Sequence, residues 1–180
     1  MTRPLRVLCL DIEGGHGGSS RSLYYLLKHV DRDAVAPTVW CRRDGPIMAR
    51  YAEIAIPVVV EPGLPKASAL PRASRNVAQL MGHAGEFWRA RGGALERLAD
   101  AASAHDIVHF NHEGFAALAW WLRRTVNVPA TMHIRTNVLA SAFARAQMRA
   151  ISRAVDAVAF ITPNEERTFR GLGGMAPGRV

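Results

Sequence analysis

Hydrophobic and polar positions alternate in blocks along the whole chain. Short runs that are apolar throughout, of which Leu5–Leu10 (LRVLCL) is the first, precede stretches in which apolar residues recur at helical spacing. In the first such stretch we expect one helical face to be buried, and its residues are Leu23, Leu26, Leu27 and Val30. Apolar runs joined by helices are typical of a parallel sheet that is covered on both faces.

The same alternation predicts the elements from end to end. Strands are expected at residues 5–10, 37–41, 57–60, 106–111, 129–134 and 157–162. Helices are expected at residues 20–30, 46–53, 76–104 (with a break near Gly92 and Gly93), 114–126, 141–155 and 164–171, and the proline-rich residues 61–75 predict an excursion loop. With right-handed crossovers the expected architecture is one α/β domain over residues 1–180, a Rossmann-like, doubly wound and mainly parallel sheet with helices on both faces.

This architecture predicts where a ligand would bind. In open parallel sheets the ligand lies outside the carboxyl ends of the strands. The segments that follow the expected strands are polar, rich in glycine and contain imidazoles, and they are residues 11–18, 42–44, 111–114, 133–137 and 162–164. We therefore expect these five segments to form the functional site.

Composition and charge narrow the class of protein. The chain has 180 residues, of which 49% are hydrophobic, and a formal net charge of +8, so it can bury a core and attract anionic ligands or surfaces. Its basic residues are scattered and no nucleic-acid-binding motif is present, so we expect no nucleic-acid partner. Cys9 and Cys41 lack the spacing of metal ligands and are expected to be buried, reduced thiols of a cytoplasmic protein.

Four of the five residues 14–18 are glycines, and they lie between the first expected strand and the first expected helix. No Gly-Lys-Ser/Thr sequence follows, which excludes a P-loop. A dinucleotide loop would need a third glycine where Ser20 stands, although Arg42 and Arg43 after the second strand would suit the 2′-phosphate of NADP. The other interpretations are a tight turn and a helix N-terminus whose backbone N–H groups approach a phosphate or a sugar hydroxyl.

Four segments, in order along the chain, resemble the N-terminal domain of the retaining glycosyltransferases of family 4, which have the two-domain GT-B fold. They are Gly17–Leu23 (GGSSRSL), His105–Asn111 (HDIVHFN), Val128–Asn137 (VPATMHIRTN) and Ala154–Gly173 (AVDAVAFITPNEERTFRGLG). The resemblance implies a hexosyltransferase of polysaccharide or glycolipid biosynthesis that uses a nucleotide-diphosphate sugar, without a metal or another cofactor. It implies that this chain is the acceptor-side half, that its partner is a nucleotide-sugar-binding C-terminal domain absent from the chain, and that the chain alone is inactive.

The resemblance also implies roles for individual residues. His133 would be the catalytic candidate, facing the transferred sugar and orienting it. Ile134 stands where the family often has an acid, so the role of Arg135, a phosphate or acceptor-carboxylate partner, stays open. His109 is expected to be structural and Pro163 to begin a helix. The candidates for donor or acceptor binding are Gly15, His16, Gly17, Gly18, Arg21, His112, Glu113, Arg135, Asn137 and Thr162.

Two alternative functions stay open beside a glycosyltransferase. An NADP-dependent oxidoreductase would need a Tyr-x-x-x-Lys pair, and the one such pair, Tyr24 and Lys28, lies in the first expected helix, where that chemistry is not placed. The other alternative is a non-catalytic binding module. Glu53 and Glu61 have the spacing of the family's acidic pair, but a buried strand is expected between them, so we interpret the spacing as coincidence.

Residues 66–97 carry a surplus of basic side chains interleaved with apolar ones. A basic amphipathic helix can lie on an anionic membrane, as in relatives with lipid acceptors, which would place the protein at the inner face of the cytoplasmic membrane. The alternative, a solvated helix with its apolar face on the sheet, is favoured. The basic residues are Lys66, Arg72, Arg75, Arg89, Arg91 and Arg97, and the apolar residues are Leu80, Met81, Phe87 and Trp88.

Overall fold

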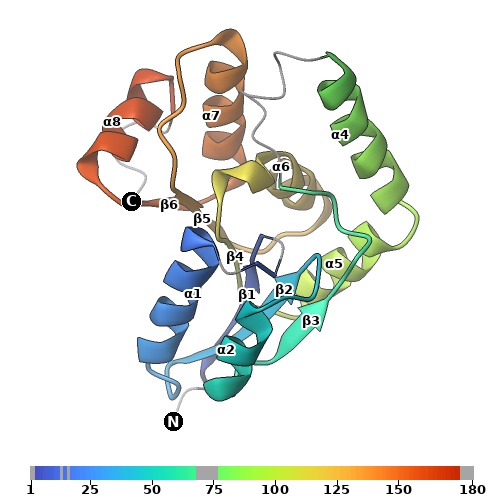
Figure 1. Cartoon of the computed structure of the whole chain (residues 1–180), viewed down its shortest axis with the longest axis vertical. Helices are drawn as coiled ribbons and strands as arrows, with labels where there is room; N and C mark the ends of the chain where they lie inside the picture. Colours follow the sequence, from blue (N-terminus) through green and yellow to red (C-terminus); the bar gives the residue numbers. More distant parts are fainter. Residues whose placement is uncertain (1–2, 13, 16, 68–76, 175–180) are drawn as a thin grey trace.

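The computed structural model describes residues 3–12, 14–15, 17–67 and 77–174, and a parallel sheet runs through the middle of them (Figure 1). The strand order is β3-β2-β1-β4-β5-β6. The chain winds outward in one direction through β2 and β3 and in the other through β4, β5 and β6, which confirms the doubly wound fold. The strands are β1 (Leu5–Leu10), β2 (Val35–Cys41), β3 (Val58–Val60), β4 (Ile107–Phe110), β5 (Ala130–Ile134) and β6 (Ala157–Phe160).

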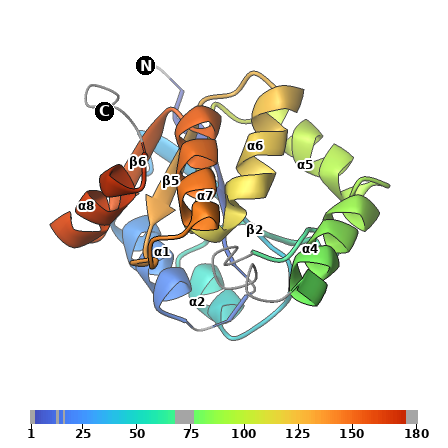
Figure 2. The same cartoon turned by 90° about the horizontal axis from the view of Figure 1, so that it is seen from above.

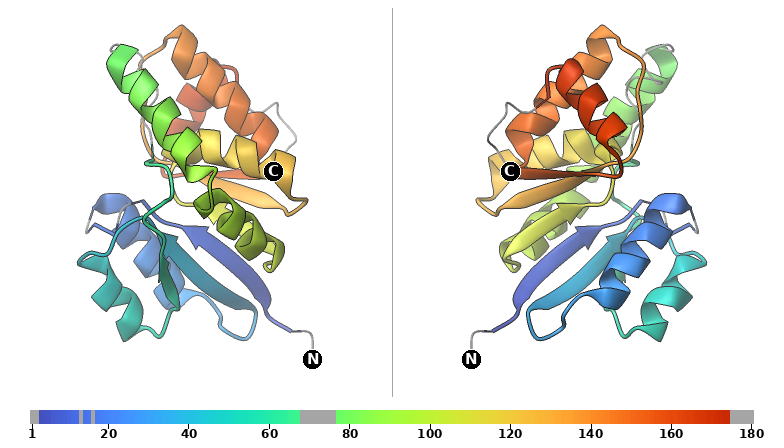
Figure 3. Two further views of the ribbon diagram at one scale, coloured as in Figure 1. Left: turned by 90° about the vertical axis from the view of Figure 1, so that its right-hand side faces the viewer. Right: turned by 90° about the vertical axis from the view of Figure 1, so that its left-hand side faces the viewer.

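Helices cover both faces of the sheet (Figure 3). On one face lie α1 (Gly18–His29) and α2 (Ile47–Glu53), and on the other α5 (Ala94–Ser103), α6 (Ala116–Thr125) and α7 (Ala142–Ala154). The 3-10 turn η1 (Glu113–Phe115) leads into α6, α4 (Val77–Ala90) precedes α5, and α8 (Pro163–Gly171) follows β6. The predicted helix break is confirmed at Gly93, whose φ of 138° favours glycine, and Pro163 begins α8 as expected.

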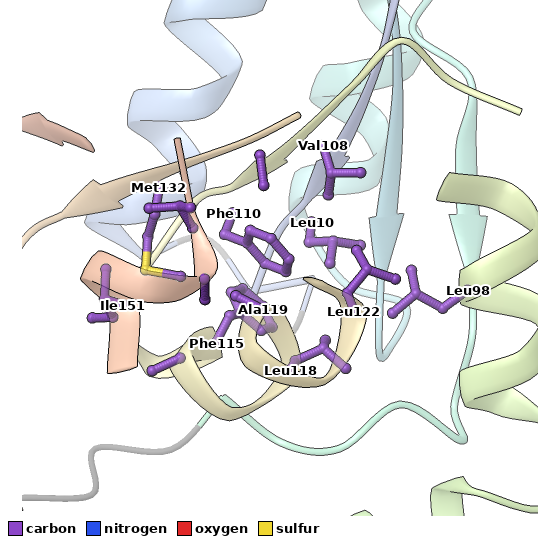
Figure 4. Close-up of a cluster of buried hydrophobic side chains, with 14 of the residues drawn as sticks. Leu10, Leu98, Val108, Phe110, Phe115, Leu118, Ala119, Leu122, Met132 and Ile151 are labelled. Carbon is purple, nitrogen blue, oxygen red and sulfur yellow. The ribbon is translucent and has the colours of Figure 1, made fainter. Parts of the chain in front are cut away.

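Two hydrophobic cores hold these layers together. The larger one joins the strand residues Val108, Phe110 and Met132 to the face of α6 that carries Leu118 and Leu122 (Figure 4). The smaller one lies under α1 and α2 and includes Leu23 and Leu27, as predicted. Leu26, however, is 52% exposed, and the neighbouring Tyr24 fills the buried face instead, so the prediction for Leu26 is wrong.

The expected thiols are confirmed in the smaller core. Cys9 of β1 and Cys41 of β2 are both buried and free. Burial raises the pKa of Cys9 to about 12, and the charge of Asp11 adds to the effect. Burial raises the pKa of Cys41 as well, so both groups stay protonated thiols near neutral pH.

The third strand differs from the prediction. β3 is an edge strand, and Val59 and Val60 are 38% and 41% exposed, because only β2 pairs with it. The two glutamates around this strand have separate partners: Arg97 donates from Nε to Glu61 at 2.7 Å, and Glu53 lies 3.7 Å from Arg50. These contacts fit the interpretation that their spacing is coincidence.

The structure confirms only part of the expectation that the helix within residues 66–97 packs its apolar face on the sheet. Phe87 is partly buried against the larger core, but Met81 and Trp88 are 67% and 71% exposed because α4 stands beside α6 and α7 rather than over the strands (Figures 1 and 2). Among the described residues no helix combines the length and apolar character needed to cross a bilayer. Arg72, Arg75 and the side chain of Leu80 lie outside what the structure describes.

The loops after β1 and β2 touch through two glycines. Gly14 has a φ of 69°, and a Cβ there would lie 2.0 Å from the carbonyl oxygen of Arg43. A Cβ on Gly45 would lie 2.1 Å from the carbonyl oxygen of Gly14. This part of the glycine-rich segment therefore serves a close approach of two backbones.

Replacing Gly14 by alanine should destabilise the chain by roughly 2–4 kcal/mol, because the new methyl group meets backbone and the residue keeps a left-handed conformation. Gly17→Ala is the matched control: its φ of −73° suits any residue and no atom lies within 4 Å of the added Cβ. Its stability should change by less than about 1 kcal/mol. Urea unfolding of the three proteins measures both effects, and a Gly14→Ala chain as stable as the parent would contradict the close approach.

Candidate functional site

A buried carboxylate stands at the carboxyl end of the central strand β1. Asp11 is 2% exposed, and its Oδ1 accepts hydrogen bonds from the Ile12 N–H at 2.8 Å and the Ser20 hydroxyl at 3.0 Å. The Asn111 amide donates to the same oxygen at 2.9 Å, and the Tyr51 hydroxyl donates to Oδ2 at 2.9 Å. These four donors offset the cost of burying the charge and tie α1, α2 and β4 to the end of β1.

Arg135, in the loop after β5, extends this network. Its Nε donates to the carbonyl oxygen of Asn111 at 2.7 Å, and its Nη2 donates to the side-chain oxygen of the same residue. Burial lowers the pKa of Arg135, while the charges of Asp11 and Glu113 act in the opposite direction. Asn111 therefore bridges the carboxylate of Asp11 and the guanidinium of Arg135, and we call these three residues with Ser20 and Tyr51 the Asp11 network.

The same guanidinium contacts the catalytic candidate His133. Nη2 of Arg135 lies 3.2 Å from Nδ1 of His133, and since a guanidinium can only donate, Nδ1 must accept. The ring proton of the neutral imidazole is therefore on Nε2. Burial and, to a smaller extent, the charge of Arg135 together lower the pKa of His133 to about 4. At neutral pH His133 is a fixed, uncharged donor that can orient a hydroxyl or a phosphate oxygen.

Glu113 supports this loop from within. Its carboxylate is 3% exposed and accepts hydrogen bonds from the Arg135 N–H at 2.9 Å and from the Thr136 hydroxyl. Its carbonyl oxygen accepts from the Gln147 amide at 2.9 Å. The neighbouring His112 accepts the Gly114 N–H on Nδ1 at 2.9 Å, and burial lowers the pKa of His112. Both candidates lie where predicted, at the carboxyl ends of the parallel strands, which we call the sheet edge. Glu113 holds the segment that carries Arg135 there by accepting its backbone N–H.

Asn137 and Thr162 belong to a separate cluster at the start of α8. Asn137 donates to Glu165 at 3.0 Å and accepts from the Thr168 hydroxyl at 3.0 Å. Thr162 caps α8 by accepting the Asn164 N–H at 3.1 Å, and its own N–H donates to Glu165 at 2.9 Å. These four hydrogen bonds join members of the cluster to one another and not to the Asp11 network, so the two candidates lie apart from His133.

Among the described residues, no side chain covers the backbone of the glycines that begin α1, beside the Asp11 network. Gly17 is the N-cap and provides no side-chain cap, and α1 has no acidic residue in its first turn. A Cβ on Gly15, Gly17 or Gly18 would meet no atom within 4 Å, so the described chain itself does not require these glycines. Free N–H groups at a helix N-terminus attract anions. Arg21 is exposed on the same helix, and His16 lies outside the described residues.

Sequence reasoning placed Asp11 and Asn111 in the right segments but did not single them out, and it missed Tyr51. A lone aspartate directly after an apolar strand was the available signal for Asp11. Tyr51 is 40 positions away from Asp11 in the chain, and nothing local marks it. Its phenol is buried, and desolvation beside Asp11 raises the pKa of Tyr51.

Two residues named for the oxidoreductase alternative, Arg42 and Tyr24, have other surroundings in the structure. Arg42 donates from Nε to the carbonyl oxygen of Leu64 at 2.9 Å. Tyr24 is 3% exposed, with its ring 6.5 Å from that of Tyr51. His109 lies in β4 with Nδ1 2.8 Å from the Thr131 hydroxyl, the structural position expected for it. Within the described ranges no group of three His, Cys, Asp or Glu side chains could hold a metal ion.

Comparison with known proteins gives a family and a similar fold. The model described as Glycosyltransferase Family 4 matches residues 16–180. The structure of Anabaena Alr3699/HepE in complex with UDP and glucose is similar, with a TM-score of 0.70 and 17% identity. The same protein in complex with UDP-glucose has a TM-score of 0.68 and 16% identity. Both comparisons cover 96% of this chain and 42% of that chain, and no curated protein matches.

Removing the central carboxylate should cost far more stability than removing one of its donors. Asp11→Ala removes the carboxylate that the buried Ser20, Asn111 and Tyr51 side chains share and leaves Asn111 and Tyr51 only their longer contacts to backbone carbonyl oxygens, so we expect a loss of about 3 kcal/mol or more. Tyr51→Phe removes a single donor and should cost about 1 kcal/mol. Urea unfolding measures both, and equal losses would show that Asp11 does not hold the elements together.

Acidification should weaken the fold through the buried histidines. Burial lowers the pKa of His109 and of His133 from 6.5 to about 4. Between these pH values the unfolded chain binds more protons than the folded chain, so the free energy of unfolding falls as the pH drops from 6.5 towards 4. Each histidine contributes on the order of 2 kcal/mol to this loss.

The variant His133→Gln isolates one of these contributions. Its unfolding free energy should fall less than that of the parent between pH 7 and pH 4.5, because His109 and His112 still titrate but residue 133 does not. Parallel pH profiles for the two proteins would show that His133 is not held neutral in the folded chain.

Proposed function

The chain belongs to Glycosyltransferase Family 4, and we propose that it is the acceptor-side domain of an enzyme that transfers a sugar from a nucleotide-diphosphate donor to an acceptor. One observation carries the proposal. The Asp11 network holds both the uncapped N-terminus of α1 and the uncharged donor His133 at the same end of the sheet. The neighbour in fold, Anabaena Alr3699/HepE, binds UDP and glucose. A sugar linked to a nucleoside diphosphate is therefore the donor that we propose.

In this proposal the glycines admit the donor diphosphate. Side chains at Gly17 and Gly18 would keep a ligand away from the backbone N–H groups of the first turn of α1. When the bond between the sugar and the diphosphate breaks, negative charge develops on the leaving oxygen. The positive end of the α1 dipole stabilises that charge without a metal ion, as we propose for this reaction.

His133 orients the transferred sugar. Its Nε2–H is the free donor, because Nδ1 is occupied by Arg135. With a pKa of about 4 the imidazole is uncharged at neutral pH, so its proposed role is to hold a sugar hydroxyl by one hydrogen bond from Nε2–H and not to act as an acid. The acceptor hydroxyl then attacks the anomeric carbon on the face from which the diphosphate leaves, so the configuration is retained, and the hydroxyl proton passes to the departing diphosphate oxygen.

A second domain completes the proposed enzyme. The chain spans 42% of the length of Alr3699/HepE. We propose that a C-terminal nucleotide-sugar-binding domain faces the sheet edge and holds most of the nucleotide. The present domain then supplies one wall of the cleft and the recognition of the acceptor.

Gly17→Val tests this role in the full-length protein. The branched side chain covers the start of α1, so we expect the affinity for a nucleotide-diphosphate sugar and the rate of nucleoside-diphosphate release to fall at least about tenfold. The Tm should stay within a few degrees because the space is empty. The probes are UDP-, GDP- and ADP-sugars. Calorimetry measures their affinity, and an assay of released nucleoside diphosphate measures the rate.

The control is Gly171→Val at the end of α8, where an added Cβ also meets no atom within 4 Å. It should leave donor affinity and turnover unchanged. If Gly17→Val also binds and turns over donor like the parent, the glycine segment is only a turn and this assignment is wrong.

A further inference from the structure

An apolar groove of about 710 Å³ runs between α4 on one side and α6 and α7 on the other, where Figure 2 shows the three helices next to one another. Its volume lies within the ~300–1,000 Å³ usual for ligand sites. Six aromatic rings line it, and several face water: Trp88 is 71%, Trp120 45% and Phe143 44% exposed. Exposed aromatic rings gathered in one concave place indicate a ligand or partner. The six are Phe87, Trp88, Phe115, Trp120, Trp121 and Phe143.

Two residues that line the groove are hydrogen-bonded to residues of the candidate site. Gly114 and Gln147 line the groove. The Gly114 N–H donates to His112 at 2.9 Å, and the Gln147 amide donates to the carbonyl oxygen of Glu113 at 2.9 Å. A molecule that lies along the groove can therefore reach the loop after β4, at the sheet edge that also carries His133.

Basic side chains border the apolar wall. Lys66 and Arg91 line the groove together with His83, and among the residues that the structure describes no aspartate or glutamate lines it. The guanidinium of Arg91 lies 5.3 Å from the centre of the Trp88 ring, a cation–π contact that keeps it at the wall. Glu86 is the nearby acid and accepts the backbone N–H of Lys66 at 3.2 Å. In the described part of the chain no carboxylate lies within ion-pair distance of the side chains of Lys66 and Arg91.

We propose that this groove binds the hydrocarbon part of a phosphate-bearing amphiphile, the acceptor of the reaction, and directs its polar end to the sheet edge. The inference rests on the proposed glycosyl transfer. Its basis is the complementarity between an aromatic wall with basic groups and an apolar chain with an anionic group. We expect a single amphiphile in the groove and not a bilayer surface against it. The aromatic rings are divided between facing helices, whereas a helix that lies on a bilayer presents one apolar face.

Two copies of the chain are a poorer match for this surface. A symmetric dimer would place the groove of one copy against the groove of the other and bring like charges together. Arg124 adds to this repulsion, because its guanidinium lies 4.4 Å from the centre of the groove-lining Trp120 ring and neither α6 nor α7 contains an acidic residue.

The test uses the 180-residue chain with octyl, decyl and dodecyl phosphate below their micelle concentrations, followed by calorimetry and tryptophan fluorescence. Affinity should rise by up to about fourfold for each added methylene group, the factor expected when a methylene leaves water. Inorganic phosphate alone should bind at least a hundredfold more weakly than dodecyl phosphate. Affinity independent of chain length, or no binding, would overturn the proposal.

Matched variants locate the site. Ala146→Trp fills the groove from α7 and should lower the affinity for decyl phosphate at least tenfold, whereas Ala52→Trp, an exposed position on α2 outside the groove, should not change it. The double variant Lys66→Gln, Arg91→Gln should weaken decyl phosphate but not the neutral decyl maltoside. Equal affinities for Ala146→Trp and the parent would overturn the assignment.

A membrane surface or a second copy of the chain in the groove would give different results. Binding to phosphatidylglycerol vesicles without binding of monomeric alkyl phosphates would indicate a membrane surface and overturn the proposal, as would a dimer that Ala146→Trp dissociates. Since no donor is present, binding of alkyl phosphate by a protein that never transfers sugar would contradict the proposed function alone. Transfer to an acceptor that Ala146→Trp leaves unchanged would contradict the groove alone.

Discussion

The carboxylate of Asp11 is the constraint on which the candidate site depends. It is a buried charge at the end of the central strand, and a buried charge is tolerated only when each of its oxygens has hydrogen-bond donors. Three of the donors come from α1, from α2 and from the residue that follows β4, segments far apart in the chain, so satisfying one carboxylate fixes the relative positions of all three. The uncapped start of α1 is thereby held at the sheet edge, although its glycines contribute no side chains of their own.

The opposite charge on Arg135 completes this arrangement. Asn111 accepts from the guanidinium and donates to Asp11, so the two charges are joined through one amide. Because the same guanidinium also donates to His133, the network that holds the backbone in place determines which ring nitrogen keeps its proton. Structure and proposed chemistry thus rest on the same few hydrogen bonds, and Glu113 supports them from the interior by holding the backbone N–H of Arg135.

The sequence allowed the sheet, the helix break at Gly93 and the segments of the site to be predicted, because apolar runs, glycines and capping residues act locally. It did not show that Leu26 would be exposed, since helical spacing gives two nearly equivalent apolar faces and Tyr24 takes the buried one. It could not show the pairing of Tyr51 with Asp11, which the packing of α2 creates. The groove was equally hidden, because the periodicity of α4 reveals its apolar residues but not the helices that they face.

In the proposed function the sheet edge held by Asp11 is a wall of a glycosyl-transfer cleft. A crystal structure of the full-length protein with a bound nucleotide-diphosphate sugar would show whether it is. We expect the diphosphate to lie within hydrogen-bond distance, about 3 Å, of the backbone N–H groups of Gly17 or Gly18, and a sugar hydroxyl to lie at the same distance from Nε2 of His133. A donor bound productively with both the glycine backbone and His133 beyond such contact would contradict the claim.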